Sequence, residues 1–343
     1  RRDRFTRATL SHDLTWLTTA FALATAGSLL LQLTLAPAIV ASATLVVVLA
    51  ELALAIALPF FFSGAAVSLA LTRSPFPAGR VYAVDLIGAA VGCLGVLGVL
   101  QVIDAPSAIL IIAAVAAASA MMFARSGIGC APEPPPRGLG FFLKPGAFCI
   151  TLAVLGLLNG ITRHGLQPIL VKEQVDHRSG ETIFERWNSF SRVIAMPPVI
   201  RAPRLWGPSP RLPAIVVPQI WLNIDGDAGT VMFRFDGDPE SARFLSYDVT
   251  NLVYALRSGA RTAIVGVGGG RDVLSAWSFG SRDVTGVEMN PIFVDLLRQP
   301  GPFSRFAGLA GLEGVRLIND EARSWFARST ETFEVLQMSM ADT

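Results

Sequence analysis

The chain has 343 residues, of which 52% are hydrophobic and 16% charged, and its mean hydropathy of +0.52 is too high for one soluble globular domain. Its formal net charge is only +2 and its basic residues are scattered, which excludes nucleic acid as the expected partner. The length allows two domains, and the composition indicates that one of them lies in a membrane and the other in water.

Charge is distributed unevenly along the chain. Between positions 14 and 124 only five residues are charged, namely Glu51, Arg73, Arg80, Asp85 and Asp104. Beyond position 163 charge is as frequent as in ordinary soluble proteins. We therefore expect transmembrane helices in 1–125, then a Pro-rich linker with one more apolar segment in 126–162, then a soluble part. Because the chain begins with Arg1 and stops after Thr343, we also expect an internal fragment of a longer protein.

Four apolar segments, at 14–36, 39–71, 81–103 and 108–124, are long enough to cross a hydrocarbon core of about 30 Å. Pro59 interrupts the second, which predicts either one kinked crossing or a crossing followed by a re-entrant piece. Basic residues before the first segment, after the second and after the fourth place these three regions in the cytoplasm by the positive-inside rule.

A fifth apolar segment, Pro145–Ile161, is short and would place the following domain outside the cell if it crossed. Either it lies at the membrane interface or upstream sequence alters the topology. In the third segment, Gly88 and Gly92 form a G-x-x-x-G pair that lets two helices approach closely. Asp85 nearby is either functional or placed at the interface beside Arg80.

The soluble part begins with a small β region at 163–243. We expect strands at 183–193, 215–217, 220–224 and 231–233. Asp225 and Gly226 begin a strong turn signal between the last two, which predicts a hairpin. Residues 244–256 return to helical spacing.

Residues 262–288 predict a buried strand, a glycine turn, a helix over 271–279 and a second strand that ends in Glu288. A dinucleotide fingerprint would be G-x-G-x-x-G, but here the sixth position is Arg271. The observed G-x-G-x-G, at Gly266, Gly268 and Gly270, resembles the first motif of S-adenosylmethionine-dependent methyltransferases. The alternative is an ordinary strand-to-helix turn without a ligand.

Several motifs together resemble the spermidine synthase family, and more narrowly its bacterial membrane-fused members. They are Trp187 to Arg192 (W-N-S-F-S-R), Tyr247-Asp248, the triple glycine at 268–270 and, in the membrane part, Tyr82 to Ala89. The resemblance covers nearly the whole chain. It implies a Rossmann-like adenosyl-cofactor domain at 244–343, truncated at its C-terminus, after the small β region.

The resemblance implies that decarboxylated S-adenosylmethionine, or S-adenosylmethionine itself, binds in this domain as co-substrate. The motif glycines would lie against its sugar and the chain bearing sulfur. Glu288 would hold the ribose hydroxyls and Met289 would flank the adenine. Asp320, at the end of a strand over 315–319, would accept the adenine amino group, with Glu321 as the alternative in a register shifted by one.

The chain departs from the family where the chemistry takes place. The synthases carry D-x-x-D-P after their fourth strand, whereas this chain has Ser339 in place of the first acid, Asp342 as the second, and Thr343 in place of the proline. A serine cannot attract a diamine by charge or serve as a comparable base. Ser339 and Asp342 nevertheless remain candidate catalytic residues.

Two further departures concern the cofactor amine and the acceptor. The synthases follow the triple glycine with an acid that grips the amine, but here Arg271 precedes Asp272. Arg271 would attract the carboxylate of intact S-adenosylmethionine or else point to solvent, and Asp272 remains a candidate cofactor ligand. Tyr247 is a candidate catalytic residue, whereas Asp248 either lines the pocket or caps its helix.

We therefore expect a transferase that moves an aminopropyl or methyl group to a small amine such as putrescine. The soluble domain would be cytoplasmic, because adenosyl cofactors occur there, and anchored in the bacterial inner membrane, with the lipid bilayer as partner. No metal is expected, and a homodimer is left open. The alternative is a transporter-like membrane protein whose soluble domain is a non-catalytic adenosyl-ligand sensor.

Overall fold

The computed structural model describes residues 9–35, 41–126, 145–162, 165–166, 170–171, 174–175, 182–226 and 228–339. The chain divides into two compact units. Unit 1 comprises Arg1–Gly180 and Trp187–Ser191, and unit 2 comprises Glu181–Arg186 and Arg192–Thr343. Unit 2 therefore joins most of the predicted β region to the predicted cofactor domain, and no unit boundary falls at the predicted division between residues 243 and 244.

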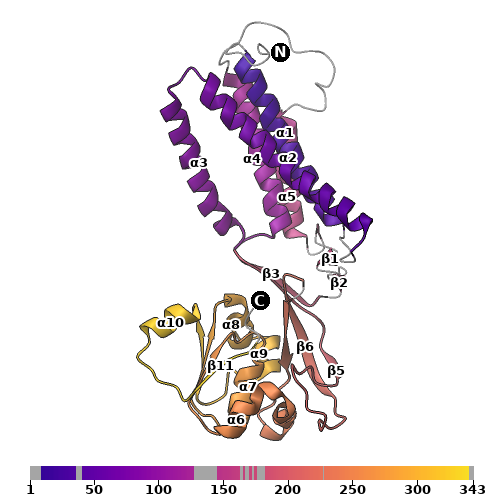
Figure 1. The fold of residues 1–343 in the computed structure, drawn as a ribbon, viewed down its shortest axis with the longest axis vertical. Coiled ribbons are helices and arrows are strands. Elements are labelled where there is room, and N and C mark those ends of the chain that lie inside the picture. Colours follow the sequence, from indigo (N-terminus) through magenta and orange to yellow (C-terminus); the bar gives the residue numbers. More distant parts are fainter. Residues whose placement is uncertain are drawn as a thin grey trace. The chain divides into compact units, whose positions relative to one another are not determined.

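Unit 1 is helical, and each predicted apolar segment is confirmed as a helix (Figure 1). Among the described residues, four helices are long and apolar enough to cross a membrane: α1 (Leu10–Thr34), α2 (Ala43–Arg73), α3 (Ala78–Val99) and α4 (Ala105–Ser126). Pro59 lies inside α2 without ending it, so the re-entrant alternative is wrong. Two-residue strands β1 (Leu170–Val171) and β2 (Gln174–Val175) pair antiparallel.

Helix α5 (Pro145–Ile161) runs antiparallel along α4. Gly146, near its start, faces Met121, and Gly160, near its end, faces Ile103 and Ser107. Gly156 packs so closely that an added Cβ would come within 3.1 Å of Ile111. Helix α5 therefore covers nearly the whole length of α4.

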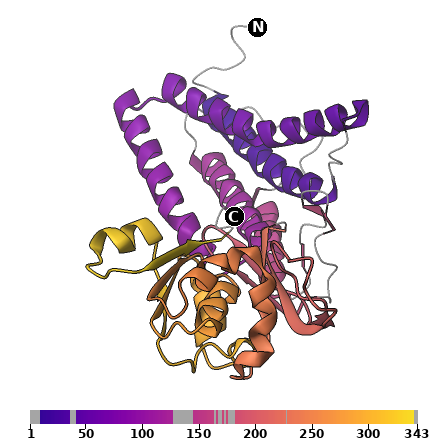
Figure 2. The same cartoon turned by 60° about the horizontal axis from the view of Figure 1, so that its bottom comes forward.

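Helix α3 stands apart from the other four helices in both views (Figures 1 and 2), and none of its residues is buried. Asp85, Gly88 and Gly92 are all exposed on it, and an added Cβ at either glycine would meet nothing within 4 Å. The close helix approach predicted from the two glycines is therefore not made by any described helix.

Unit 2 begins with a five-stranded sheet of β3 (Phe184–Trp187), β4 (Arg192–Ala195), β5 (Val199–Arg201), β6 (Val217–Ile224) and β7 (Ala228–Phe233). Strand β6 pairs antiparallel with β4, β5 and β7, which confirms the predicted hairpin. The single strand predicted over 183–193 is wrong. Its middle is a turn in which Asn188 Oδ1 accepts from the backbone N–H of Ser191 at 2.8 Å.

A four-stranded parallel sheet follows, in the order β10 (Val315–Asn319), β9 (Val284–Glu288), β8 (Thr262–Val265) and β11 (Val335–Met338). The region predicted as one helix over 244–256 is instead two 3₁₀ helices and one α-helical turn, with a break at Asp248. The elements in chain order are η2 (Pro239–Tyr247), η3 (Val249–Asn251), α6 (Leu252–Leu256), β8 (Thr262–Val265), α7 (Arg271–Ser278), β9 (Val284–Glu288), α8 (Pro291–Arg298), α9 (Pro302–Ala307), β10 (Val315–Asn319), α10 (Ala322–Arg328) and β11 (Val335–Met338).

One hydrophobic core holds the two sheets of unit 2 together. Leu222 and Met232 of the antiparallel sheet belong to the same buried cluster as Ile264 of β8, Val273 of α7 and Phe293 of α8. The β region is therefore packed against the parallel sheet and is not a separate domain.

Candidate functional site

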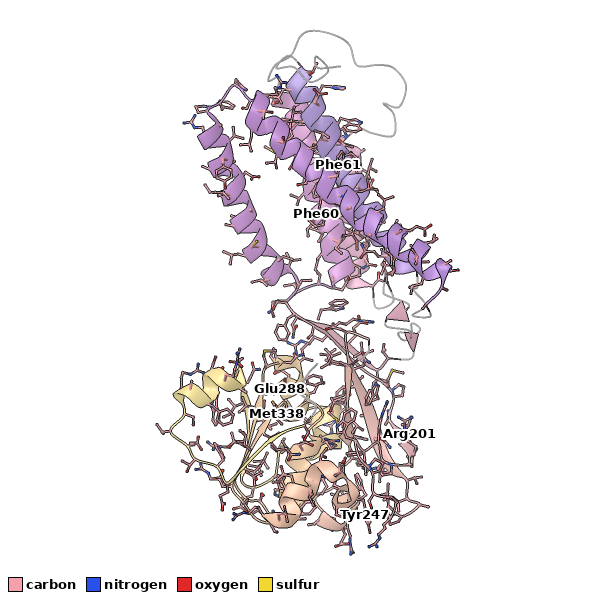
Figure 3. The ribbon with its side chains drawn as sticks, in the orientation of Figure 1. Phe60, Phe61, Arg201, Tyr247, Glu288 and Met338 are labelled. Atoms are coloured by element: carbon pink, nitrogen blue, oxygen red, sulfur yellow. The ribbon has the colours of Figure 1, made fainter. Side chains whose placement is uncertain are left out.

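The carboxyl ends of the four parallel strands meet at one edge of the sheet. Val265 pairs with both Val287 and Met338, and Glu288 pairs with Asn319. The edge therefore gathers the glycine loop, Glu288 and the residues that follow β10 and β11. Figure 3 shows Glu288 and Met338 in the same part of unit 2. In open α/β sheets, ligands bind in the crevice outside these carboxyl ends.

The glycine loop is shaped both by its backbone and by strand β7. Gly266, Gly268 and Gly270 have φ values of 77°, 51° and 85°, in the left-handed region that favours glycine. At Gly269 an added Cβ would lie 2.4 Å from the carbonyl oxygen of Val231 on β7. Packing within the protein is thus sufficient to require this glycine, whether or not a ligand binds.

Glu288 braces this loop. Its Oε2 accepts from the N–H of Gly268 at 2.9 Å and its Oε1 from the N–H of Asn290 at 2.8 Å. Burial raises the pKa of Glu288, although these backbone hydrogen bonds oppose the increase. Because Glu288 is mostly buried and accepts from several backbone N–H groups, a ligand hydroxyl would have to share its acceptor sites with them. The predicted ribose contact is compatible with the bracing role.

Asn290 and Pro291 begin α8. Asn290 Oδ1 accepts from the N–H of Ile292 at 3.2 Å, and Pro291 is the first helical residue. This cap fixes the chain directly after Glu288 and Met289.

The predicted adenine end of the site is at β9 and β10. Met289 is 55% exposed there, and its carbonyl oxygen accepts from Asn319 Nδ2 at 3.0 Å. The same amide also donates to the carbonyl oxygen of Glu288 at 2.9 Å. Asn319 therefore ties the ends of these strands together and leaves an apolar side chain, that of Met289, exposed at the edge.

Asp320 and Glu321 differ in how far their carboxylates are occupied. Asp320 accepts from the N–H of Glu321 at 2.8 Å and pairs with Arg328. Glu321 caps α10 through Ser324, accepting from its N–H at 2.9 Å and its hydroxyl at 2.8 Å. These bonds, with that from the N–H of Arg323, lower the pKa of Glu321 to about 2. Because the Glu321 carboxylate already caps α10, Asp320 is the better placed candidate for the adenine amino group.

Arg271 is buried between two carboxylates. Its Nη2 lies 2.8 Å from Asp272 Oδ1, and its Nη1 lies 3.3 Å from Asp248 Oδ2. All three side chains are at most 6% exposed. The alternative in which Arg271 points to solvent is therefore wrong. The charges of Arg271 and of the candidate cofactor ligand Asp272 therefore largely neutralise each other.

Asp248 is a structural cap, as one of its two predicted readings required. Its carboxylate accepts from the N–H groups of Thr250 at 3.2 Å, Gly207 at 3.1 Å and Trp206 at 3.1 Å. Tyr247, the residue before it, ends the 3₁₀ helix η2. Figure 3 shows Tyr247 well apart from Glu288 and Met338. The structure does not bring Tyr247 to the sheet edge.

Ser339 follows β11 directly and lies at the edge. Its Oγ accepts from Gln337 Nε2 at 2.8 Å, and Gln337 in turn bonds the hydroxyl of Tyr254. A pocket of about 440 Å³ opens beside these residues. Asp342, the other candidate acid, and Thr343 lie outside the described residues.

Thr230, Asn319, Gln337 and Tyr254 support the site but were not predicted. Thr230 Oγ1 accepts from the N–H of Gly269 at 3.2 Å. Asn319 and Gln337 are polar residues near the ends of apolar strands, a signal that could have been used. Thr230 carries no such signal, because only the packing of β7 against the loop brings it there.

No family model and no curated protein matches this chain.

Proposed function

We propose that unit 2 is a Rossmann-like domain that binds S-adenosylmethionine or its decarboxylated form at the carboxyl edge of the parallel sheet. One observation carries this proposal. The Glu288 carboxylate is joined to the left-handed glycine loop through Gly268 N–H, so an acid and a glycine turn lie side by side. Adenosyl ligands require this pair, because the acid accepts the ribose hydroxyls while the loop passes beneath the sugar.

The other groups at the edge suit the remainder of the ligand. The exposed side chain of Met289 offers an apolar surface to the adenine ring. Asp320 would accept the adenine amino group, although it would have to share its carboxylate with Arg328. The bound nucleoside would then extend from β8 across β9 to β10.

The arrangement of Arg271 bears on which form of the cofactor binds. A free guanidinium would favour the carboxylate of intact S-adenosylmethionine, but this one is held by Asp248 and Asp272. Arg271 therefore does not favour binding of the intact form. Titration of both forms decides between them.

As an enzyme, the protein would transfer an aminopropyl or methyl group from the sulfonium to a nucleophile held near Ser339. Catalysis would be mainly alignment, because the sulfonium already activates the carbon. The helices of unit 1 would anchor the domain in the bacterial inner membrane, with unit 2 in the cytoplasm, where the cofactor occurs.

Calorimetric titration of the whole chain in detergent with each cofactor form tests the binding. We expect Glu288→Ala to weaken binding about 10- to 100-fold, because hydrogen bonds to a charged group contribute about 1.5–3 kcal/mol. Glu313→Ala, an exposed acid in a loop of the same unit, is the control and should bind normally. Unchanged affinity in Glu288→Ala would contradict the proposed site.

The second candidate function, a non-catalytic sensor, is favoured by Ser339, which replaces the acid expected of a synthase. Turnover assays with putrescine and with methyl acceptors separate the two. Cofactor binding with no turnover on any acceptor would support the sensor, whereas amine-dependent release of the sulfur-containing product would support the transferase.

A further inference from the structure

The chain that leaves strand β5 returns over one face of the antiparallel sheet. Arg201 is the last residue of β5 and pairs with Val217 of β6, while Val199 pairs with Gln219. Paired residues, and residues two positions apart on a strand, share a face of the sheet. Arg201 therefore lies on the face that also carries Gln219 and Trp221 of β6.

The side chain of Gln219 holds the segment 201–204 in place. It is only 1% exposed, and its Oε1 accepts from the backbone N–H of Arg204 at 3.2 Å. Its Nε2 donates to the carbonyl oxygens of Arg201 at 3.2 Å and Ala202 at 2.9 Å. Because a buried amide without these partners would be costly, the bonds fix the backbone on both sides of the turn. Arg201 and Arg204 are thus held as a pair.

The guanidinium of Arg204 is oriented by an aromatic ring. Its Cζ lies 3.7 Å from the ring centroid of Trp221. Stacking of this kind fixes the plane of a guanidinium but leaves the N–H donors at its edge available. Partial burial, and then the nearby charge of Arg201, lower the pKa of Arg204. The two cations are therefore close enough to disfavour each other.

This pair differs from other arginines of unit 2. Arg186, Arg261 and Arg316 each form an ion pair with an acid. Among the residues that the structure describes, no acid forms such a pair with Arg201 or Arg204. An anion bound by both would relieve their repulsion. Phosphate oxygens suit this arrangement, because a guanidinium can donate two parallel hydrogen bonds to them.

We propose that Arg201 and Arg204, held on this face of the sheet by Gln219 and Trp221, bind a phosphate group. A lipid headgroup and a soluble phosphate offer the same oxygens to such a site. Figure 3 shows Arg201 well apart from Glu288, so the site is separate from the proposed adenosyl site and does not depend on it.

The test measures how fast phenylglyoxal, a reagent for guanidinium groups, modifies single arginines of the whole chain in maltoside, a detergent without phosphate. One arm adds inorganic phosphate, and the other mixes phosphatidylglycerol into the micelles, both at constant ionic strength and without adenosyl ligand. Peptide mass spectrometry gives the rate at each arginine. We expect Arg201 and Arg204 to be protected in at least one arm, and Arg257, an exposed arginine of the same unit, to react at an unchanged rate.

The two arms identify the source of the phosphate. Protection by inorganic phosphate shows that a soluble ligand suffices, whereas protection by the lipid alone identifies a headgroup, and either result supports the site. No protection of this pair in either arm, or equal protection of Arg257, would overturn the proposal.

A variant tests whether the two arginines act together. Arg204→Gln should raise the phosphate or lipid concentration that half-protects Arg201 about tenfold, because the anion loses one of its two guanidinium partners. Arg204 is exposed, so this change leaves the core intact. Arg257→Gln removes the same charge elsewhere and is the matched control, which should leave the protection of Arg201 unchanged. Equal protection of Arg201 in the two variants would also contradict a shared site.

Discussion

The helices of unit 1 and the sheets of unit 2 differ in the hydrogen-bond partners of their polar side chains. In unit 1 the hydroxyl groups mostly bond to their own helix: Thr15 Oγ1 donates to the carbonyl oxygen of Ser11 at 2.7 Å, and Thr25 Oγ1 to that of Phe21 at 2.8 Å. In unit 2 some buried groups also bond across long stretches of chain, as Arg271 does to Asp248 and Tyr254 to Gln337. Local bonding suits a helix in lipid, where no water can replace a missing partner.

The two units also place their apolar side chains differently. Phe60 and Phe61 on α2 are 74% and 66% exposed, whereas Ile264 and Phe293 of unit 2 are at most 1% exposed (Figure 3). A surface as apolar as that of α2 is expected of lipid-facing helices. Unit 1 therefore exposes apolar surface suited to lipid, whereas unit 2 encloses its apolar side chains in one core and adds a few long-range polar pairs.

The largest effect should come from removing the buried cation of unit 2. Arg271→Met leaves Asp248 and Asp272 without their partner, and breaking a buried ion pair in this way costs about 3–5 kcal/mol. We expect the denaturant midpoint of unit 2, followed by tryptophan fluorescence, to fall accordingly. Arg257→Met, at an exposed position, should leave it unchanged. A decrease of less than about 1 kcal/mol in the unfolding free energy of Arg271→Met would show that these ion pairs contribute little to the stability of unit 2.

The next largest effect tests the contact between the glycine loop and β7. Gly269→Ala places a Cβ 2.4 Å from the backbone oxygen of Val231, which cannot move without shifting β7. Overpacking of this kind costs about 1–3 kcal/mol. Gly311→Ala is the matched control, because an added Cβ there meets nothing within 4 Å. Equal unfolding free energies for the two variants would contradict the close packing of the loop on β7.

Unit 1 also contains hydrogen bonds between helices, such as that from the Ser11 hydroxyl to the carbonyl oxygen of Phe123, and breaking another of them should have a smaller effect. Asn159 on α5 donates to Ser107 Oγ at 2.8 Å and to Asp104 Oδ1 at 3.2 Å, both near the start of α4. Asn159→Leu should destabilise the helix bundle by about 0.6 kcal/mol and by no more than about 1.7 kcal/mol, the average and the maximum found for hydrogen bonds between membrane helices.

Detergent-mixture unfolding measures this change. Thr151→Val on the same helix removes only a bond to the carbonyl oxygen of Ala147 and should have almost no effect. If both variants behave alike, α5 is not held to α4 by the Asn159 cluster.

The smallest effect is the pH dependence of Glu288. Its pKa is raised in the folded protein, so the ionised form is less favourable in the folded than in the unfolded state. The wild type should therefore gain stability relative to Glu288→Gln as the pH falls from 7 through the raised pKa. Over the same interval adenosyl-ligand affinity should decrease, because the protonated carboxyl loses acceptor capacity. Denaturation and calorimetry at pH 5 and pH 7 measure both trends, and flat profiles would contradict the raised pKa.

Local patterns predicted the regular elements well. The apolar lengths of the helices, the turn at Asp225-Gly226, and Asn290 before Pro291 are all signals that lie within a few residues of the elements they define. Two predictions failed because a polar side chain has a hydrogen-bond partner that the hydrophobic pattern does not reveal. Asn188 Oδ1 accepts from the backbone N–H of Ser191, which breaks the strand, and Arg271 is buried because it pairs with Asp248, 23 residues upstream.

The sequence by itself determined which parts are apolar enough for lipid, that a strand ending in Glu288 follows a glycine turn, and that Ser339 stands where an acid was expected. Only the tertiary structure decided that Arg271 is enclosed by Asp248 and Asp272, that β7 packs on the glycine loop, and that Gln337 aligns Ser339. Periodicity and turn residues act over a few positions, whereas the partners of buried polar groups are chosen by packing between segments distant in sequence.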